Sequence, residues 1–184
     1  MKKIKLIFFS FIYFLFFTIN AFSESFDEWK KSFSKYAISE GISDQTLFLI
    51  EDFKFLPKVI EYDRYQPEFY EDTFTYITKR ANNKKASIGL KTYKSNSKLI
   101  NQVEKKFNVE KELLLSLMGI ETNFGKYLGK MDILSSLATL SFDKRRSEFF
   151  TKELIIALRL IDNKKIKADE LYGSWAGAFG NFQF

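Results

Sequence analysis

From residue 26 onward, apolar side chains recur at the three- and four-residue spacing that marks one face of an α-helix. A first helix is predicted to start near Phe26 and to end before Gly41, and Ser43 is predicted to cap the next one. No segment shows the sustained two-residue alternation, bounded by hairpin turns, that is typical of strands. The pattern therefore predicts an all-α domain.

Later segments extend the same helical reading. The run "LLLSLMGI" predicts an apolar helix, with Asn108 placed to cap its N-terminus. Further helices are predicted over residues 68–80, over a region ending near residue 107, and over residues 147–161.

The first 23 residues differ from the rest. They contain three lysines, an apolar run from about Leu6 to Phe17, and the small-residue pattern Ala21-Phe22-Ser23. This layout is typical of a secretory signal peptide, and its apolar run is short for a membrane span. We therefore predict a signal peptide over 1–23, a domain over 24–184 and a periplasmic location. A retained membrane anchor is the alternative, and a lipoprotein is excluded because no Cys follows the run.

Composition fits a folded, exported domain. Apolar residues make up 46% and charged residues 28% of the 184 positions, a balance typical of a globular protein. The chain has 29 basic and 23 acidic residues; since residues 1–23 hold three lysines and no acid, the remainder carries a net charge of +3. So small an excess argues against nucleic acid as the partner and is compatible with an anionic polymer.

Two absent residue types narrow the chemistry. The chain has no Cys and no His, which excludes thiol nucleophiles, Ser-His dyads and ordinary zinc centres. No calcium-loop pattern of the Asp-x-Asp-x-Asp-Gly kind occurs. We expect no metal and no cofactor, so any catalysis must use carboxylates, Lys, Tyr or backbone groups.

Glu121 follows the apolar run directly. If buried at the C-terminal end of that helix, its carboxyl would be pushed toward the neutral form by desolvation and by the helix dipole, as suits a general acid. The alternative is a side chain that simply points to solvent. Gly125 and Gly129 follow, and glycines permit left-handed backbone and the close approach of a ligand.

Four ordered blocks then carry a family resemblance: "DRYQPEF", "GIETNFGKYLG", "LATLSFDKRRSEFFTKEL" and "GSWAGAFGNFQF". With them, residues 24–184 resemble the B-type lytic murein transglycosylases of the lysozyme-like superfamily. The resemblance implies a lysozyme-like helical fold. It also implies cleavage of the β-1,4 bond between N-acetylmuramic acid and N-acetylglucosamine in peptidoglycan without water, leaving a 1,6-anhydro sugar.

The same resemblance implies roles for individual residues. Glu121 would first protonate the leaving oxygen and then accept the proton of the attacking muramyl 6-hydroxyl. Arg145 and Arg146 would line the glycan groove, unless they form only a solvated helix entrance. Ser174 and Gln183 would hydrogen-bond the sugar, although Ser174 would serve equally as an N-cap. Weaker candidates for substrate contact are Gln66 and Tyr65, whereas Asp132 and Asp143 are expected to be structural.

One difference from the family pattern leaves alternative functions open. The sequence given stops at Phe184, inside the last block, whereas family members continue. We therefore expect a domain that is incomplete at its C-terminal end, so a catalytically silent peptidoglycan-binding remnant is the main alternative. A lysozyme-type hydrolase and a membrane-anchored helical protein are further ones. Glycan strands are the expected partner, and the chain is expected to be a monomer.

Overall fold

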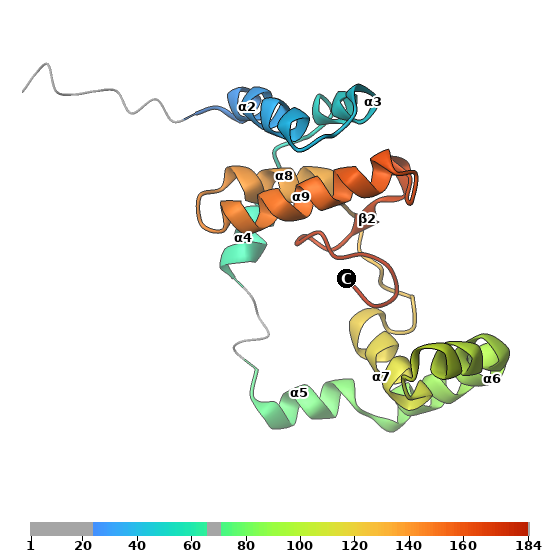
Figure 1. Ribbon diagram of the computed structural model, residues 1–184. Helices are drawn as coiled ribbons and strands as arrows, with labels where there is room; N and C mark the ends of the chain where they lie inside the picture. The colour runs from blue at the N-terminus through green and yellow to red at the C-terminus, as the bar shows by residue number, and fades with distance from the viewer. Residues whose placement is uncertain (1–23, 66–70, 184) are drawn as a thin grey trace, which may run out of the picture.

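Two groups of helices, one above the other in Figure 1, make up the part of the chain that the structure, a computed structural model, describes: residues 24–65 and 71–183. One lobe contains α2, α3, α4, α8 and α9, and the other contains α5, α6 and α7. The elements are α2 (Phe26–Ser39), α3 (Asp44–Leu47), the 3-10 helix η1 (Phe48–Ile50), α4 (Pro57–Arg64), α5 (Thr73–Arg80), α6 (Asn83–Phe107), α7 (Lys111–Thr122), β1 (Met131–Asp132), α8 (Ile133–Phe142), α9 (Ser147–Asp162), η3 (Ala168–Glu170) and β2 (Tyr172–Gly173).

Helix α8 is the centre of the first lobe. Nine of its ten residues are buried, all but Phe142. Helix α9 runs beside it (Figure 1) and contributes Phe150, Leu154 and Leu158 to the core. The N-terminal helices cover the remaining face, where Phe33 and Val59 are buried. A continuous apolar cluster therefore holds this lobe together.

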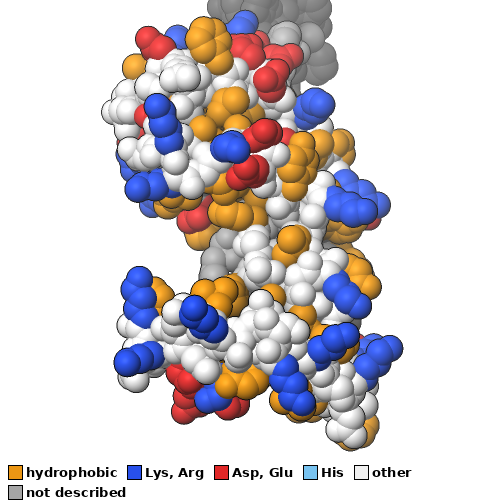
Figure 2. Space-filling model, turned by 90° about the vertical axis from the view of Figure 1, so that its right-hand side faces the viewer, with side chains coloured by type: hydrophobic (Ala, Val, Ile, Leu, Met, Phe, Trp, Pro, Cys, Tyr) orange, Lys and Arg blue, Asp and Glu red, His pale blue; other side chains and the backbone are white. Residues whose placement is uncertain are grey.

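The second lobe has far less core. Helix α6 is kinked at Asn96, whose side-chain amide donates to the Thr92 carbonyl, and α7 packs against it. Of all residues in α5, α6 and α7, only Ile100, Gly119 and Thr122 are buried. The space-filling view shows a waist between the lobes, with Lys and Arg side chains spread over the second one (Figure 2).

A short antiparallel pair joins the chain before α8 to the C-terminal segment. Met131 pairs with Gly173 and Asp132 with Tyr172. Gly129 lies against this segment with φ +85°, and a Cβ placed on it would come within 2.0 Å of the Gly173 carbonyl oxygen. The predicted all-α fold is confirmed, with this two-residue pair as its only strand pairing of named strands among the described residues.

Several predicted boundaries are confirmed and two are wrong. Helix α6 ends at Phe107 and α9 spans 147–162, as expected. Asn108, predicted as the N-cap of α7, is instead the C-cap of α6 with φ 52°, a left-handed conformation that Asn tolerates. The helix predicted over 68–80 begins at Thr73, because Asp72 accepts the N–H of Thr75 and caps it there.

The predicted signal peptide, residues 1–23, lies outside the described residues. Within 24–65 and 71–183, no helix has the length and apolar character needed to cross a membrane.

Candidate functional site

Glu121 lies in the last turn of α7, one residue before its end. The chain then turns sharply through three consecutive left-handed residues, Asn123, Phe124 and Gly125. The expected left-handed glycines are thus confirmed, since Gly125 and Gly129 both have positive φ. Of the two alternatives for Glu121, burial and a side chain that points to solvent, the structure shows the second: the side chain is exposed.

Thr122, the next residue, is fully buried and fixes the end of α7. Its hydroxyl oxygen accepts the N–H of Gly125 at 3.0 Å and lies 2.9 Å from the carbonyl oxygen of Asn181, to which it can donate. The C-terminal segment is therefore tied to the turn directly after Glu121.

The Glu121 carboxyl makes no hydrogen bond or ion pair with any described residue. The two acids that follow Glu121 before α9, Asp132 and Asp143, do have partners. Asp132 accepts the N–H of Ser135 at 2.6 Å and so caps α8, and Asp143 accepts from Arg64 at 2.7 Å. Both contacts fit the structural role expected for these acids.

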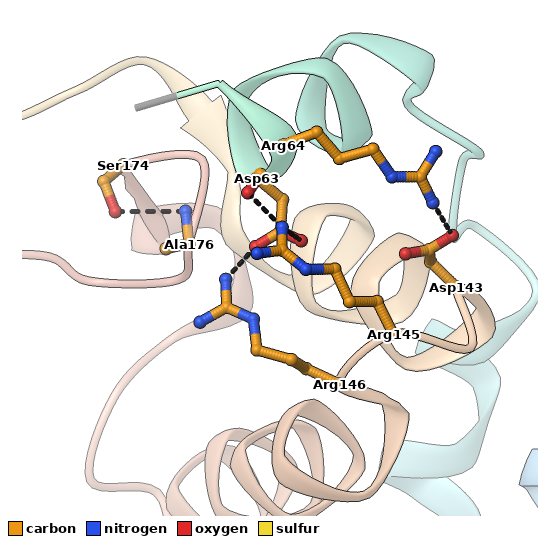
Figure 3. A network of polar contacts seen from close by, with 7 residues as sticks. All are labelled: Asp63, Arg64, Asp143, Arg145, Arg146, Ser174 and Ala176. Atoms are coloured by element: carbon orange, nitrogen blue, oxygen red, sulfur yellow. Dashed lines mark hydrogen bonds and ion pairs between the residues drawn. The ribbon is translucent and has the colours of Figure 1, made fainter. Parts of the chain in front are cut away.

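Arg145 and Arg146 lie in the loop between α8 and α9 and meet at one buried acid, Asp63 (Figure 3). Arg145 Nη1 donates to Asp63 Oδ2 at 2.9 Å and also to the Asp63 carbonyl oxygen. Arg146 Nη2 donates to the other carboxylate oxygen, Oδ1, and its guanidinium lies 4.9 Å from the centre of the Phe150 ring. One carboxylate thus bridges two guanidinium groups.

The burial of this cluster is uneven. The Asp63 side chain is 1% exposed, whereas those of Arg145 and Arg146 are 50% and 40% exposed. The bridging acid is therefore inside the protein, while both cations reach solvent. Asp63 is also the only ionisable side chain that is buried among the described residues.

Ser174 and Gln183 are both engaged within the chain. The Ser174 hydroxyl oxygen accepts the N–H groups of Ala176 and Ala178 at 3.3 and 3.1 Å, which closes a turn rather than capping a helix (Figure 3). Its O–H has no acceptor among the described residues. The Gln183 amide donates to the carbonyls of Leu128 and Gly180, so it holds the C-terminal segment against the loop after α7.

The remaining candidates fall in the "DRYQPEF" block. Gln66 lies outside the described residues, and Tyr65, at the C-cap of α4, is 58% exposed. Sequence reasoning assigned candidate roles to these two residues and missed Asp63, the first residue of the same block. The available signal was an acid at the start of a block that accompanies two adjacent arginines.

Two cavities among the described residues lie near helices of the two lobes, and Glu121 lines neither of them. The larger, about 650 Å³, lies between α6 and α7 and is lined by Gly89, Gly119, Ile120 and Phe124 among others. The smaller, about 350 Å³, lies by α2 and α9 beside Trp29 and Lys152. Glu121 therefore lies next to residues of the larger cavity and outside it.

Comparison with known proteins bears directly on this arrangement. The family model described as the transglycosylase SLT domain matches residues 25–184. The membrane-bound lytic murein transglycosylase B of Escherichia coli strain K12 is 38% identical over 86 residues, which are 46% of this chain and 24% of that protein.

Solved structures agree on the fold. SltB3 from Pseudomonas aeruginosa, in complex with NAG-anhNAM-pentapeptide, superposes with a TM-score of 0.83 at 30% identity, covering 88% of this chain and 43% of that one. The Escherichia coli lytic transglycosylase Slt35, in complex with bulgecin A, gives 0.73 at 28% identity, covering 84% of this chain and 51% of that one. The chain thus spans from a quarter to about half the length of these relatives.

Proposed function

Because its residues 25–184 match the transglycosylase SLT domain, the chain belongs to that family, and we propose that it cleaves the β-1,4 bond between N-acetylmuramic acid and N-acetylglucosamine in peptidoglycan. No water is added in the proposed reaction. The product is a glycan end that carries 1,6-anhydro-N-acetylmuramic acid.

Glu121 is proposed as the single catalytic residue. In the first step its carboxyl gives a proton to the glycosidic oxygen as the bond from that oxygen to C1 breaks. In the second step the muramyl 6-hydroxyl oxygen bonds to C1, and its proton returns to the carboxylate. Atoms and charge balance with one carboxyl, because the sugar's own hydroxyl replaces the water that a hydrolase would activate with a second acid.

The proposal is supported most directly by the hydrogen-bond and ion-pair partners of the three acids between residues 121 and 143. Asp132 and Asp143 are held by Ser135 and Arg64, whereas Glu121 has no partner among the described residues. A one-carboxyl reaction needs only such a free acid. The similar SltB3 structure, which holds an anhydro-muramyl ligand, supports this choice over lysozyme-type hydrolysis.

Because Glu121 is exposed, the proposed reaction requires that water be excluded from its carboxyl when the substrate is bound. Water competes with the 6-hydroxyl for C1 unless something covers the carboxyl during the reaction. We infer that the bound glycan provides part of that cover, and that Ser174, with its O–H free to donate, Gln183, Gln66 and the two arginines contribute to holding it. In this proposal the bound glycan strand is the substrate and also helps to exclude water from C1 and from the Glu121 carboxyl.

Purified murein sacculi test the proposal. The protein should release muropeptides that end in 1,6-anhydro-N-acetylmuramic acid, identified by mass spectrometry. Glu121→Gln removes the transferable proton at nearly constant shape and should lower the rate by about 10²- to 10⁴-fold without loss of folding. Glu112→Gln, an exposed Glu at the start of the same helix, is the matched control and should leave the rate unchanged. Undiminished release by Glu121→Gln would refute the role of Glu121.

Glycan binding without cleavage is the second candidate function, and the exposed position of Glu121 outside both cavities favours it. In that case the protein would co-sediment with sacculi and release no anhydro-muropeptides. Reducing-end muramic acid among the products would instead indicate a hydrolase.

We also propose that residues 1–23 direct export and that the domain acts in the periplasm as a monomer. Their apolar run and the small residues before Glu24 support cleavage there. N-terminal sequencing of protein recovered from the periplasm would identify Glu24 as the first residue, whereas a retained Met1 would contradict the proposal.

A further inference from the structure

Asp63 occupies an unusual position for a charged group. Its side chain is 1% exposed, and transfer of a lone carboxylate from water to such a site is costly. Arg145 and Arg146 offset that cost, each through one terminal nitrogen. Asp63 therefore requires both cations, and both cations are restrained by it.

The cluster has charge and hydrogen-bonding capacity to spare. One carboxylate faces two guanidinium groups, so one positive charge is left over. Each arginine bonds Asp63 through a single nitrogen, and its other donors have no partner in the part of the chain that the structure describes. With half-exposed side chains, these donors are open to a ligand.

The orientation of those donors is fixed. Arg145 is held by both the carboxylate and the carbonyl oxygen of Asp63, and the Arg146 guanidinium also lies against the Phe150 ring. Long side chains on a loop normally lose conformational freedom when they bind a ligand, and restraint before binding removes much of that loss. Fixed, planar donors with a net positive charge suit a carboxylate.

We propose that Asp63 is a positioning residue that holds Arg145 and Arg146 for a carboxylate of the glycan strand, and so makes the chain prefer muramyl glycans over uncharged ones. This inference rests on the proposed function for the identity of its ligand. The carboxylate belongs either to the lactyl group of N-acetylmuramic acid or to the peptide attached to it, since both sources share this chemistry.

Binding, measured without turnover in the Glu121→Gln background, tests the inference with three probes. Peptide-bearing glycan strands, strands freed of peptide by an amidase, and chitotetraose differ in carboxylate source, and the last has none. The parent should bind at least one of the first two at least tenfold more tightly than chitotetraose. The stronger-binding strand identifies the source of the carboxylate, and equal binding of all three would overturn the proposal.

Asp63→Asn separates positioning from charge. The variant is more positive by one, so if charge alone attracts the strand, its affinity for carboxylate-bearing strands should rise. If Asp63 positions the arginines, that affinity should fall at least fivefold, because the new amide N–H₂ opposes the arginine donors. Binding of chitotetraose should stay within twofold. A rise, or an equal fall for all three probes, would overturn the proposal.

Two further variants keep the proposal testable if Asp63→Asn does not fold. Replacing both arginines by Lys keeps the charge at half-exposed positions but removes the planar fork, and it should abolish the preference. A retained preference would count against the proposal. Glu40→Gln breaks an arginine–carboxylate pair with Arg159, 2.6 Å long, elsewhere on the same lobe and should change nothing.

The outcome is separable from that of the proposed reaction. A preference for carboxylate-bearing strands that depends on Asp63, found in a protein that releases no anhydro-muropeptides, would support this inference and overturn the proposed catalysis. Anhydro products with no such preference would do the reverse.

Discussion

Helices α7 and α8 have similarly apolar sequences, but α8 is almost entirely buried and α7 is mostly exposed to solvent. Both carry long apolar runs, "LLLSLMGI" and "ILSSLATLSF". In α8 nine of ten residues are buried, whereas in α7 only Gly119 and Thr122 are. Helix α8 packs against α9 and α4, but α7 packs mainly against α6. The difference lies in the neighbouring elements rather than in the helices themselves.

That contrast matters for function because Glu121 is on the poorly covered helix. The well-packed lobe holds the arginine cluster in a fixed arrangement, while the proposed acid lies where the protein encloses little. Apolar residues Leu113, Leu117 and Ile120 on α7 remain 52%, 37% and 43% exposed.

The largest difference should appear when a leucine is truncated in each helix. Leu140 in α8 is 1% exposed, so Leu140→Ala removes packed methyl groups and leaves a cavity. It should lower the free energy of unfolding by about 2–5 kcal/mol. Leu113→Ala on α7, the matched control, should cost about 0.5 kcal/mol or less. Urea unfolding measures both, and equal losses would mean that α7 is covered in solution.

Thr122→Val tests the hydroxyl that ties the turn after Glu121 to the C-terminal segment. The change keeps the shape but leaves the Gly125 N–H and the Asn181 carbonyl without their hydroxyl partner. We expect a loss of about 1–3 kcal/mol in the free energy of unfolding, and slower release of anhydro-muropeptides because the turn after Glu121 loosens.

Ser116→Ala is the control on the same helix, since the Ser116 hydroxyl is exposed and bonds only the Glu112 carbonyl. It should change stability by about 0.5 kcal/mol or less and leave the rate unaltered. If Thr122→Val behaves like Ser116→Ala, the end of α7 is not held by this hydroxyl.

The fold was largely predictable because helix formation depends on local spacing. Apolar periodicity placed α2, α9 and the end of α6 correctly. Asn108 was misassigned because Asn suits both a cap before a helix and the left-handed residue after one, and spacing does not distinguish them. The β1–β2 pair escaped prediction because two residues are too few to show alternation.

The site was predictable only as a set of residue types. Motif resemblance selected Glu121, Arg145 and Arg146, but neither the exposure of the first nor the burial of Asp63 follows from local sequence. Burial depends on which elements meet, and Asp63 lies more than 80 positions from the arginines that it joins. The spacing of apolar residues along the chain does not reveal such long-range contacts.

The caps of the two helices differ as well, on a smaller scale. Asp132 accepts the Ser135 N–H at 2.6 Å and caps α8, whereas Glu110 at the start of α7 makes no such bond. Asp132→Ala should therefore lower the free energy of unfolding by about 1 kcal/mol. Glu110→Ser should supply the missing cap and raise it by about 0.5 kcal/mol or more. Thermal melts of the two variants should shift in opposite directions, and a shift in one direction for both would contradict this difference.

The smallest expected effect concerns the polar contacts that further secure the better-packed lobe, and it depends on pH. Asp162, at the end of α9, accepts hydrogen bonds from Ser43 and from Thr46, the latter at 2.6 Å. The Ser43 hydroxyl, followed by that of Thr46, holds the pKa of Asp162 below its ordinary value of 3.8. Because the folded state favours the charged form, the contribution of Asp162 to stability is present above the ordinary pKa and is lost as the pH falls through the lower, folded value.

Asp162→Asn should therefore be less stable than the parent at neutral pH. The difference between the urea midpoints of the parent and the variant should shrink as the pH is lowered from about 5 to about 2. Asp52→Asn, an exposed acid without a partner among the described residues, should show no gap at any pH. A gap for Asp162→Asn that widens in acid would mean that the native state prefers the neutral acid, opposite to what the two hydroxyl donors require. Since α3 and α9 belong to the same lobe as α8, a gap that behaves as expected would show that this lobe is secured by polar contacts between helices as well as by its apolar core.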